Sequence, residues 1–218
     1  MKMNNRRAFL QFGVAGAAVL AGLQQALSID PHQWNEWVSR ALLRPSRLTP
    51  TFPKVRAKEP RANGSVGLED DVAEDWQLTV EGPAGVRALS LEQLKALPAV
   101  EMTTELMCVE GWSEIVSWKG TRLSNIAPAN APEYVSLKTP DQLYFVGLDL
   151  ESALHPQTLL AWEMNGQPLT PEHGAPLRLV IPVKYGIKNI KRIGTIEFMA
   201  QRPKDYWYDR GYDWYAGL

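Results

Sequence analysis

The stretch TTELMCVEGWS, residues 103–113, contains the single cysteine of the chain, Cys108. A β-prone run from Val100 to Leu106 precedes the cysteine and Gly111 follows it, which predicts a strand that opens into a turn. A lone cysteine cannot form a disulfide within the chain, so Cys108 is either an inert buried side chain or a thiolate with a chemical role. Because turns at strand ends commonly carry ligands and nucleophiles, the second alternative stays open.

The composition is typical of a globular protein with one domain. The chain has 218 residues, of which 45% are hydrophobic and 22% charged. The first 27 residues carry three of the 23 basic side chains and none of the 24 acidic ones, so the remainder has a net charge of −4. This charge does not favour a nucleic acid as partner. Sixteen prolines and sixteen glycines predict many turns, and eight tryptophans suit a β-rich core or a buried pocket.

Residues 1–27 have the pattern of a twin-arginine export signal. Arg6 and Arg7 stand directly before an apolar run from Phe9 to Leu23 that is rich in small residues. We therefore expect a periplasmic or otherwise exported protein, tethered to the membrane if the signal is not cleaved. The alternative is an ordinary secretory signal beside a chance arginine pair. The twin-arginine route generally exports proteins already folded around a cofactor, which favours a metal cofactor.

Residues 28–74 are expected to form a helix and an extended arm. Apolar residues from Trp34 to Leu42 recur at helical spacing, and Pro31 suits the start of that helix. Residues 44–73 are rich in proline, glycine and charge without a sustained period, so we expect them to lie extended on the surface of the domain.

The segment 75–200 is expected to be one α+β domain. Ser90 to Gln93 form a capping box that opens a short helix, and Asn165-Gly166 signals a hairpin. A helical turn is expected at 122–126. Strands are expected at 76–82, 100–106, 116–118, 134–138, 143–148, 159–163, 168–169, 177–181 and 193–198. The elements lack the regular alternation of a doubly wound sheet, so the sheets are predicted to be mixed and mainly antiparallel.

A second informative stretch, residues 173–192, begins HGAPLR and is dense in hydrogen-bond donors. Besides His173 and Arg178 it holds four cations around a glycine turn, namely Lys184, Lys188, Lys191 and Arg192. Guanidinium and ammonium groups beside such a turn suit a phosphate or a polar heterocycle. The alternative is a solvated basic loop.

Four sequence blocks resemble one known family. They are CVEGWS at 108–113, GLDL with ALHP at 147–156, MNGQPL at 164–169, and HGAPLR through KYGIK at 173–188. In this order they resemble the molybdopterin-binding oxidoreductase domain of the sulfite oxidase superfamily, and within it the periplasmic protein-methionine-sulfoxide reductase catalytic subunits most closely. The resemblance runs from about residue 75 to 199. It implies the sulfite-oxidase-type fold, an enzyme, and a molybdenum–molybdopterin cofactor.

The resemblance also implies roles for individual residues. Cys108 would be the thiolate ligand of molybdenum, and a soft thiolate suits a metal that is already bound to sulfur. Glu110 would face the metal site and transfer protons, or else be an ordinary turn carboxylate. Arg178 is suited to bind the phosphate of the pterin cofactor through two parallel hydrogen bonds from its guanidinium. The full set of residues that match cofactor-binding positions is Thr139, His173, Arg178, Asn189, Ile190 and Lys191.

The chain also departs from the family pattern. His173 stands where the methionine sulfoxide reductases commonly have asparagine, and histidine there is typical of sulfite oxidases. The Asn-x-x-Tyr-Glu motif of those reductases is missing before residue 75, and Arg61 or Asn63 are the candidates to replace it. The immunoglobulin-like dimerisation domain of sulfite oxidases is not expected after the last core strand, which predicts a monomeric catalytic unit.

The sequence leaves three functions open. The first is oxygen-atom transfer that reduces small-molecule or protein-bound sulfoxides such as methionine sulfoxide, with electrons from a haem-containing membrane protein or cytochrome. The second is a sulfite oxidase-like dehydrogenase; cations around the pocket would favour sulfite, whereas an apolar mouth would favour sulfoxides. The third is a non-catalytic cofactor-binding subunit of a membrane complex, in which Cys108 would be buried away from any cavity.

The C-terminal tail, residues 201–218, is dense in aromatic side chains between 205 and 215. Three roles are compatible with this composition. The tail could pack over the mouth of the cofactor site, form a docking surface for an electron-transfer partner, or attach the end of the chain to the body of the domain.

Overall fold

The computed structural model describes residues 31–43, 47–68 and 71–218, which belong to two compact units, 1–42 and 43–218. The predicted export signal lies outside the described residues. All of helix α2 (Pro31–Leu43) except its last residue belongs to the first unit, and the helix begins at the proline that the sequence indicates. The rings of Trp34 and Trp37 stack within this helix, with 5.2 Å between their centroids. None of the helices in the described part of the chain is long and apolar enough to cross a membrane.

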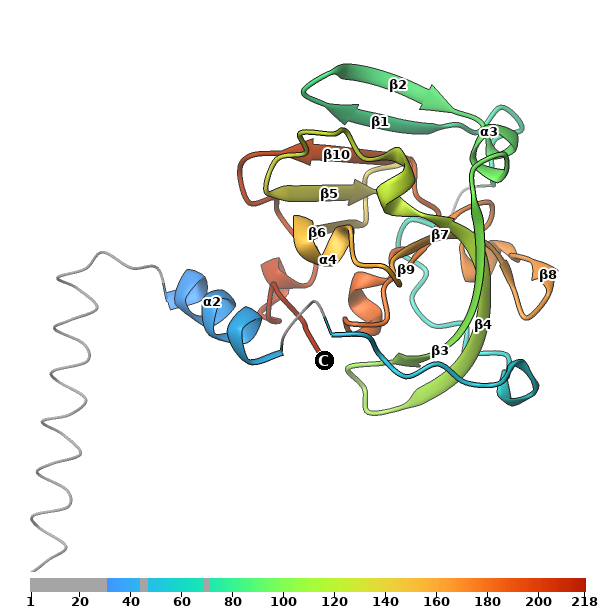
Figure 1. Cartoon of the computed structure of the whole chain (residues 1–218), viewed down its shortest axis with the longest axis horizontal. Helices are drawn as coiled ribbons and strands as arrows, with labels where there is room; N and C mark the ends of the chain where they lie inside the picture. Colours follow the sequence, from blue (N-terminus) through green and yellow to red (C-terminus); the bar gives the residue numbers. More distant parts are fainter. Residues whose placement is uncertain (1–30, 44–46, 69–70) are drawn as a thin grey trace, which may run out of the picture. The chain divides into compact units, whose positions relative to one another are not determined.

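Two five-stranded sheets form the body of the second unit, as far as the structure describes it (Figure 1). The first sheet has the order β2-β1-β10-β5-β6, and its one parallel pair is β1 with β10. Its strands are β1 (Leu78–Gly82), β2 (Gly85–Leu89), β5 (Tyr134–Lys138), β6 (Phe145–Asp149) and β10 (Thr195–Met199). The predicted α+β class with mixed, mainly antiparallel sheets is confirmed.

The second sheet is antiparallel and has the order β3-β4-β7-β8, with β9 also paired to β7. Its strands are β3 (Ala99–Met107), β4 (Ser113–Arg122), β7 (Leu159–Met164), β8 (Gln167–Pro168) and β9 (Arg178–Val180). The hairpin between β7 and β8 turns at Asn165 and Gly166, which both have positive φ, as a two-residue hairpin turn of this kind requires.

The helices of the second unit are short. Ser90 caps α3 (Leu91–Lys95) through the predicted capping box, in which the Gln93 backbone N–H donates to the Ser90 hydroxyl and the Ser90 N–H donates to the Gln93 side chain. The other helical elements are α4 (Leu150–Ala153) and the 3-10 turns η1 (Lys54–Arg56), η2 (Leu123–Ile126), η3 (Pro171–His173), η4 (Gly186–Lys188) and η5 (Tyr208–Arg210).

Three elements differ from the prediction. Strand β2 was not expected, because it lies at the edge of its sheet with mainly exposed side chains and so lacks an alternating apolar pattern. Strand β4 extends over 113–122 and not only 116–118, since it pairs with β3 on one side and β7 on the other. Helix α4 has four residues, too few to show a helical period.

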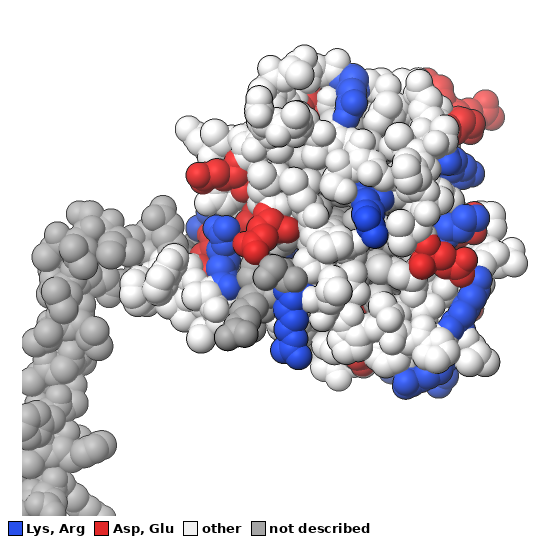
Figure 2. Space-filling model, in the orientation of Figure 1, with Lys and Arg blue, Asp and Glu red and all other residues white. Residues whose placement is uncertain are grey.

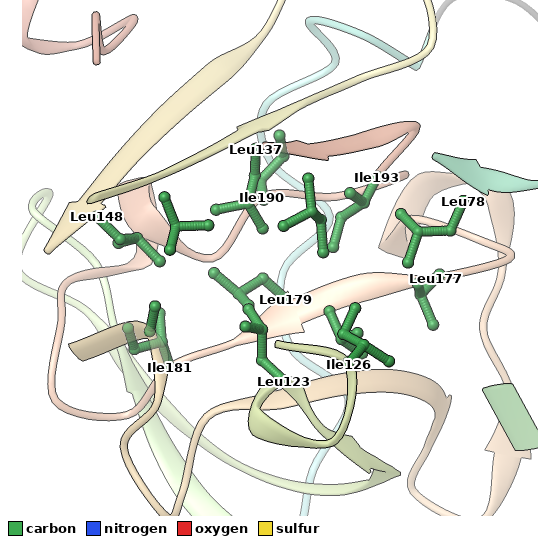
Figure 3. Packing of buried hydrophobic residues seen from close by; sticks show 14 of the residues in the cluster. Leu78, Leu123, Ile126, Leu137, Leu148, Leu177, Leu179, Ile181, Ile190 and Ile193 are labelled. Atoms are coloured by element: carbon green, nitrogen blue, oxygen red, sulfur yellow. The ribbon is translucent and has the colours of Figure 1, made fainter. Parts of the chain in front are cut away.

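The main hydrophobic core is shared by the two sheets. Leu78, Leu137 and Leu148 from the first sheet meet Leu179 from the second around the η2 side chains (Figure 3). Strand β7 is buried on both faces, because Leu160 belongs to this core while Leu159 belongs to a second apolar cluster. The two sheets therefore hold the loops at their ends in fixed positions.

The C-terminal segment is attached to β6 by a buried ion pair. The Lys188 Nζ donates to Asp205 Oδ2 at 2.5 Å and to the Gly147 carbonyl at 3.0 Å. The Gly147 N–H also donates to the same carboxylate oxygen at 3.1 Å. Burial lowers the pKa of Lys188, and the charge of Asp205 opposes that shift. Trp214 is buried beside this pair, with its ring centroid 4.9 Å from the Lys188 Nζ.

We predict that Asp205→Ala lowers the free energy of unfolding by about 3–5 kcal/mol, because it leaves the Lys188 ammonium buried without its partner. The double variant with Lys188→Met should lose less than the sum of the two single variants, by about 0.5–3 kcal/mol. Guanidinium unfolding followed by circular dichroism measures both quantities, with Asp209→Ala as the exposed control. Strictly additive losses would contradict the assignment of a coupled buried pair.

Candidate active site

A cleft with about 970 Å³ of empty space, its open mouth included, lies in the second unit. Its lining comes from segments far apart in the sequence: the arm at 60–66, the turn at 106–112, the stretch 173–191 and the tail at 207–212, together with Tyr144. Both stretches that the sequence singled out, and the aromatic tail, therefore meet at one cavity.

Cys108 opens the turn between β3 and β4. Its N–H donates to the Trp112 carbonyl at 2.9 Å, and the Gly111 N–H donates to the Cys108 carbonyl at 3.1 Å. Gly111 adopts a φ of 87°, in the left-handed region that favours glycine. A Cβ on Gly186 would lie 3.3 Å from the Met107 carbonyl oxygen, so the η4 turn packs closely against this turn. The half-buried thiol lines the cleft, at the predicted end of a strand.

Glu110 lines the cleft in the same turn. The Trp112 indole N–H donates to its carboxylate at 2.9 Å, and the Asn63 side-chain amide donates to the same oxygen at 3.4 Å. The Asn63 Nδ2 also lies 4.0 Å from the Cys108 Sγ. Asn63 thus connects the arm with the thiol and the carboxylate of the turn.

Arg178 presents a buried cation to the cleft. Its side chain donates to the carbonyl oxygens of His173 at 3.1 Å and Asn189 at 3.4 Å, and its guanidinium lies 4.7 Å from the Trp118 ring centroid. Its Nε is buried without a hydrogen-bond partner, and no described carboxylate pairs with it. Burial lowers the pKa of Arg178 to about 10, so it stays charged at neutral pH. A buried cation without a counter-ion is suited to bind an anion.

Lys191 adds a second cation beside Arg178. Its Nζ donates to the carbonyl oxygens of Asn63 at 2.7 Å and Gly64 at 3.2 Å. Burial, and then the charge of Arg178, lower the pKa of Lys191 to about 8. His173 is buried next to both cations, and its pKa is lowered by burial and then by these charges. Its imidazole is therefore neutral at neutral pH and can accept or donate a hydrogen bond.

Six of the eight residues that the sequence singled out line this one cleft. They are Cys108, Glu110, His173, Arg178, Asn189 and Lys191. Both candidates for the missing upstream motif, Arg61 and Asn63, line it as well. The residues come from the arm, from the turn after β3, and from η3, β9 and the loop that follows β9.

Thr139 and Ile190 lie outside the lining. The Thr139 hydroxyl donates to Asp141 at 2.5 Å and accepts from the Tyr144 N–H at 3.1 Å, so it holds the turn before β6. The Ile190 side chain points into the main core near Leu137 (Figure 3). Binding of a cofactor by either residue stays a prediction.

Lys184 and Lys188 have a role other than the one proposed from the sequence. Both are buried in ion pairs, Lys184 with Asp149 at 3.3 Å and Lys188 with Asp205. Burial lowers the pKa of Lys184 to about 7. The basic stretch is thus neither a solvated loop nor a uniform donor cluster, because its members divide between the core and the cleft.

Two aromatic residues of the cleft, Trp112 and Tyr144, were not predicted from the sequence. Trp207 and Tyr212 belong to the aromatic tail, for which packing over the cofactor site was one of three roles considered, and both line the cleft. On the face shown in Figure 2, lysine and arginine are interspersed with aspartate and glutamate. An anion site is therefore indicated by Arg178 and Lys191 in the cleft and not by the charge of this surface.

Comparison with known proteins identifies relatives of the chain. The family model described as "Oxidoreductase molybdopterin binding domain" matches residues 63–207. The putative protein-methionine-sulfoxide reductase subunit YedZ1 of Azospira oryzae is 34% identical, over 97% of this chain and 87% of that protein. The protein-methionine-sulfoxide reductase catalytic subunit MsrP of Xanthomonas campestris is 39% identical over 62% of this chain and 48% of its own length. The protein-methionine-sulfoxide reductase catalytic subunit MsrP of Campylobacter jejuni is 36% identical, over 62% of this chain and 52% of its own length.

A solved structure shows the same fold. The sulfane dehydrogenase SoxCD from Paracoccus pantotrophus superposes with a TM-score of 0.57 at 18% identity, over 72% of this chain and 46% of that chain. The chain spans about half the length of the MsrP relatives and of this structure. The resemblance stated from the sequence blocks is confirmed, and so is the sulfite-oxidase-type fold.

We predict that anion binding in the cleft weakens as Lys191 loses its proton. A bound anion favours the ammonium form, so the affinity should fall by up to about tenfold per pH unit above the pKa of about 8. Calorimetric titration of the cofactor-free full chain with inorganic pyrophosphate between pH 7 and 9 measures this. Lys191→Met should bind more weakly and show only the titration of pyrophosphate itself. The exposed Lys204→Met is the matched control, and equal pH profiles for all three proteins would refute the assignment.

Proposed function

The chain belongs to the family of molybdopterin-binding oxidoreductase domains, and from this premise we propose that it reduces sulfoxides such as methionine sulfoxide. It is a molybdenum-dependent oxidoreductase of the sulfite-oxidase type. One observation carries the proposal: the Cys108 thiol and the guanidinium of Arg178, which no described carboxylate neutralises, line one cleft together with aromatic side chains.

The residues of the cleft fit the cofactor. The buried Arg178 Nε lacks a partner, which suits the phosphate that the pterin carries. Lys191 would add a second charge to the same phosphate. Cys108 offers a soft thiolate for the metal. When bound, the cofactor supplies two-electron oxygen-atom transfer, while the protein supplies binding and orientation.

The groups of the chain itself would handle protons and orientation. Reduction of a sulfoxide to a thioether takes two electrons and two protons, and the oxygen leaves as water. Glu110 is positioned to deliver protons, because its exposed carboxylate is held by Trp112 and Asn63 beside the Cys108 turn. Neutral His173 would donate to or accept from the cofactor without adding charge.

The aromatic side chains of the tail support sulfoxides over sulfite. Trp207 and Tyr212 carry no charge and can contact a methyl sulfoxide. Trp112 has the Arg61 guanidinium 5.8 Å from its ring centroid, so the preference for sulfoxides rests on the two rings of the tail. The buried Arg178 and the half-buried Lys191 are accounted for by the phosphate of the cofactor. The non-catalytic alternative required a Cys108 remote from any cavity, and this residue lines the cleft instead.

Export and an electron donor complete the proposal. The arginine pair Arg6-Arg7 before an apolar run supports export to the periplasm by the twin-arginine route, with a membrane tether if the signal stays in place. The names of the relatives describe subunits, which supports a partner protein. A haem-containing membrane protein or a cytochrome would deliver the electrons, one at a time, to a monomeric catalytic unit.

Metal and pterin analysis of the exported full chain tests the proposed function. We expect about one molybdenum per wild-type chain, together with reduction of methionine sulfoxide when a chemical electron donor is added. In Cys108→Ala the activity should fall more than about 100-fold, because even outer-shell partners of a metal contribute about 10- to 100-fold. Folded wild-type protein without molybdenum would refute the proposal.

A second variant separates binding from chemistry. Arg178→Lys keeps the charge but loses the planar guanidinium, which can donate two parallel hydrogen bonds to a phosphate. We therefore expect a roughly tenfold lower cofactor content under limiting molybdenum. The activity per bound molybdenum should change little, because the substituted group lies away from the reacting atoms. Arg122→Lys, an exposed arginine on β4, serves as the matched control. A normal cofactor content in Arg178→Lys would contradict the assignment of Arg178 as the residue that binds the phosphate of the pterin.

A further inference from the structure

The C-terminal tail both attaches itself to the domain and lines the cleft. Trp214 and Tyr215 are fully buried and account for the attachment. Trp207 and Tyr212, by contrast, face the cleft that Cys108 lines. Tyr212 is 42% exposed, at the rim, and Trp207 is partly exposed. These two rings are therefore available to a molecule that enters the cleft.

Asp205 holds this part of the tail in place. While its Oδ2 accepts from Lys188, its Oδ1 accepts from the N–H groups of Trp207 and Tyr208, each at 3.1 Å. The Tyr212 N–H donates to the Trp207 carbonyl at 3.0 Å. The Trp207 ring lies edge-on between Tyr206 and Tyr212, with centroids 5.4 Å and 5.1 Å away. Both rings are thus fixed before any ligand binds.

A short series of contacts connects these rings with the thiol turn. Tyr206 contacts Tyr144 with 5.0 Å between their centroids, and the Tyr144 hydroxyl donates to the Ile187 carbonyl at 2.7 Å. Gly186, the preceding residue, packs against the turn, since a Cβ there would lie 3.8 Å from the Cys108 Cα. These contacts therefore fix the position of the Trp207 and Tyr212 rings relative to the Cys108 turn.

Resting on the proposed sulfoxide reduction, we propose that Trp207 and Tyr212 are the residues that recognise the substrate. They form an uncharged wall that contacts the methyl sulfoxide side chain and the polypeptide on either side of it. Sulfur and methyl groups pack favourably against aromatic rings, and a rigid tryptophan with a tyrosine at the rim is typical of surfaces that bind a chain. The wall selects methionine sulfoxide within a polypeptide over compact sulfoxides.

Steady-state kinetics of the full-chain holoenzyme test this proposal. The substrates are a pentapeptide with one central methionine sulfoxide and dimethyl sulfoxide, with the same chemical electron donor. In Trp207→Ala we expect the KM for the peptide to rise about tenfold, the upper range of a sulfur–aromatic contact, with kcat unchanged. Tyr212→Ala should raise the KM for the peptide less. Trp207→Phe should have a KM close to that of the wild type, because it keeps an aromatic ring. The value of kcat/KM for dimethyl sulfoxide should fall less than that for the peptide in Trp207→Ala, because this compact substrate has no polypeptide that contacts the rings.

Two controls keep the outcome decisive. Tyr208→Ala removes a ring of the same tail that does not line the cleft. This ring packs on Arg202, with 4.7 Å between its centroid and the guanidinium carbon. The dissociation constant of the same peptide with methionine sulfone, which is measured by calorimetry and needs no turnover, should rise in parallel with KM in Trp207→Ala.

The outcomes separate this proposal from the one on which it rests. A wild-type holoenzyme that reduces neither substrate would refute sulfoxide reduction. If wild type is active but Trp207→Ala behaves like Tyr208→Ala, or lowers kcat equally for both substrates, the recognition wall is wrong. Unchanged binding of the sulfone peptide in Trp207→Ala and Tyr212→Ala would also overturn it, whatever the activity.

Discussion

The buried guanidinium of Arg178, which no described carboxylate neutralises, is the constraint around which the cleft is built. Burying an unpaired charge is costly, so the fold compensates with two carbonyl oxygens and the face of Trp118. Lys184 and Lys188 are equally buried, but each has an aspartate partner and serves the core. The contrast between paired and unpaired cations distinguishes the residues that hold the fold from the residue that awaits an anion.

The cleft combines cationic and aromatic side chains that come from different parts of the chain. Arg178 and Lys191 are cations, which suit the phosphate of a pterin. Trp207 and Tyr212 of the tail add uncharged rings. The η4 turn packs against the cysteine turn at Gly186. A cofactor held at its phosphate end would therefore bring its metal to the thiol and its substrate to the rings.

Local patterns in the sequence predicted much of this arrangement. The capping box at Ser90, the hairpin at Asn165-Gly166 and the strand that ends at Cys108 each depend on neighbouring residues, and each is confirmed. The division of the basic stretch between core and cleft was not predictable, because Asp149 and Asp205 lie far from their lysines in the sequence. The position of the aromatic tail stayed one of three alternatives for the same reason, since contacts distant in the chain place Trp207 at the cleft.

The decisive experiment is anomalous X-ray diffraction at the molybdenum edge, from crystals of the protein exported in a molybdenum-replete host. We expect one anomalous peak inside the cleft, bonded to the Cys108 Sγ, with the phosphate of the pterin in contact with the Arg178 guanidinium. A peak elsewhere on the molecule, or a loaded protein whose phosphate does not contact Arg178, would contradict this expectation.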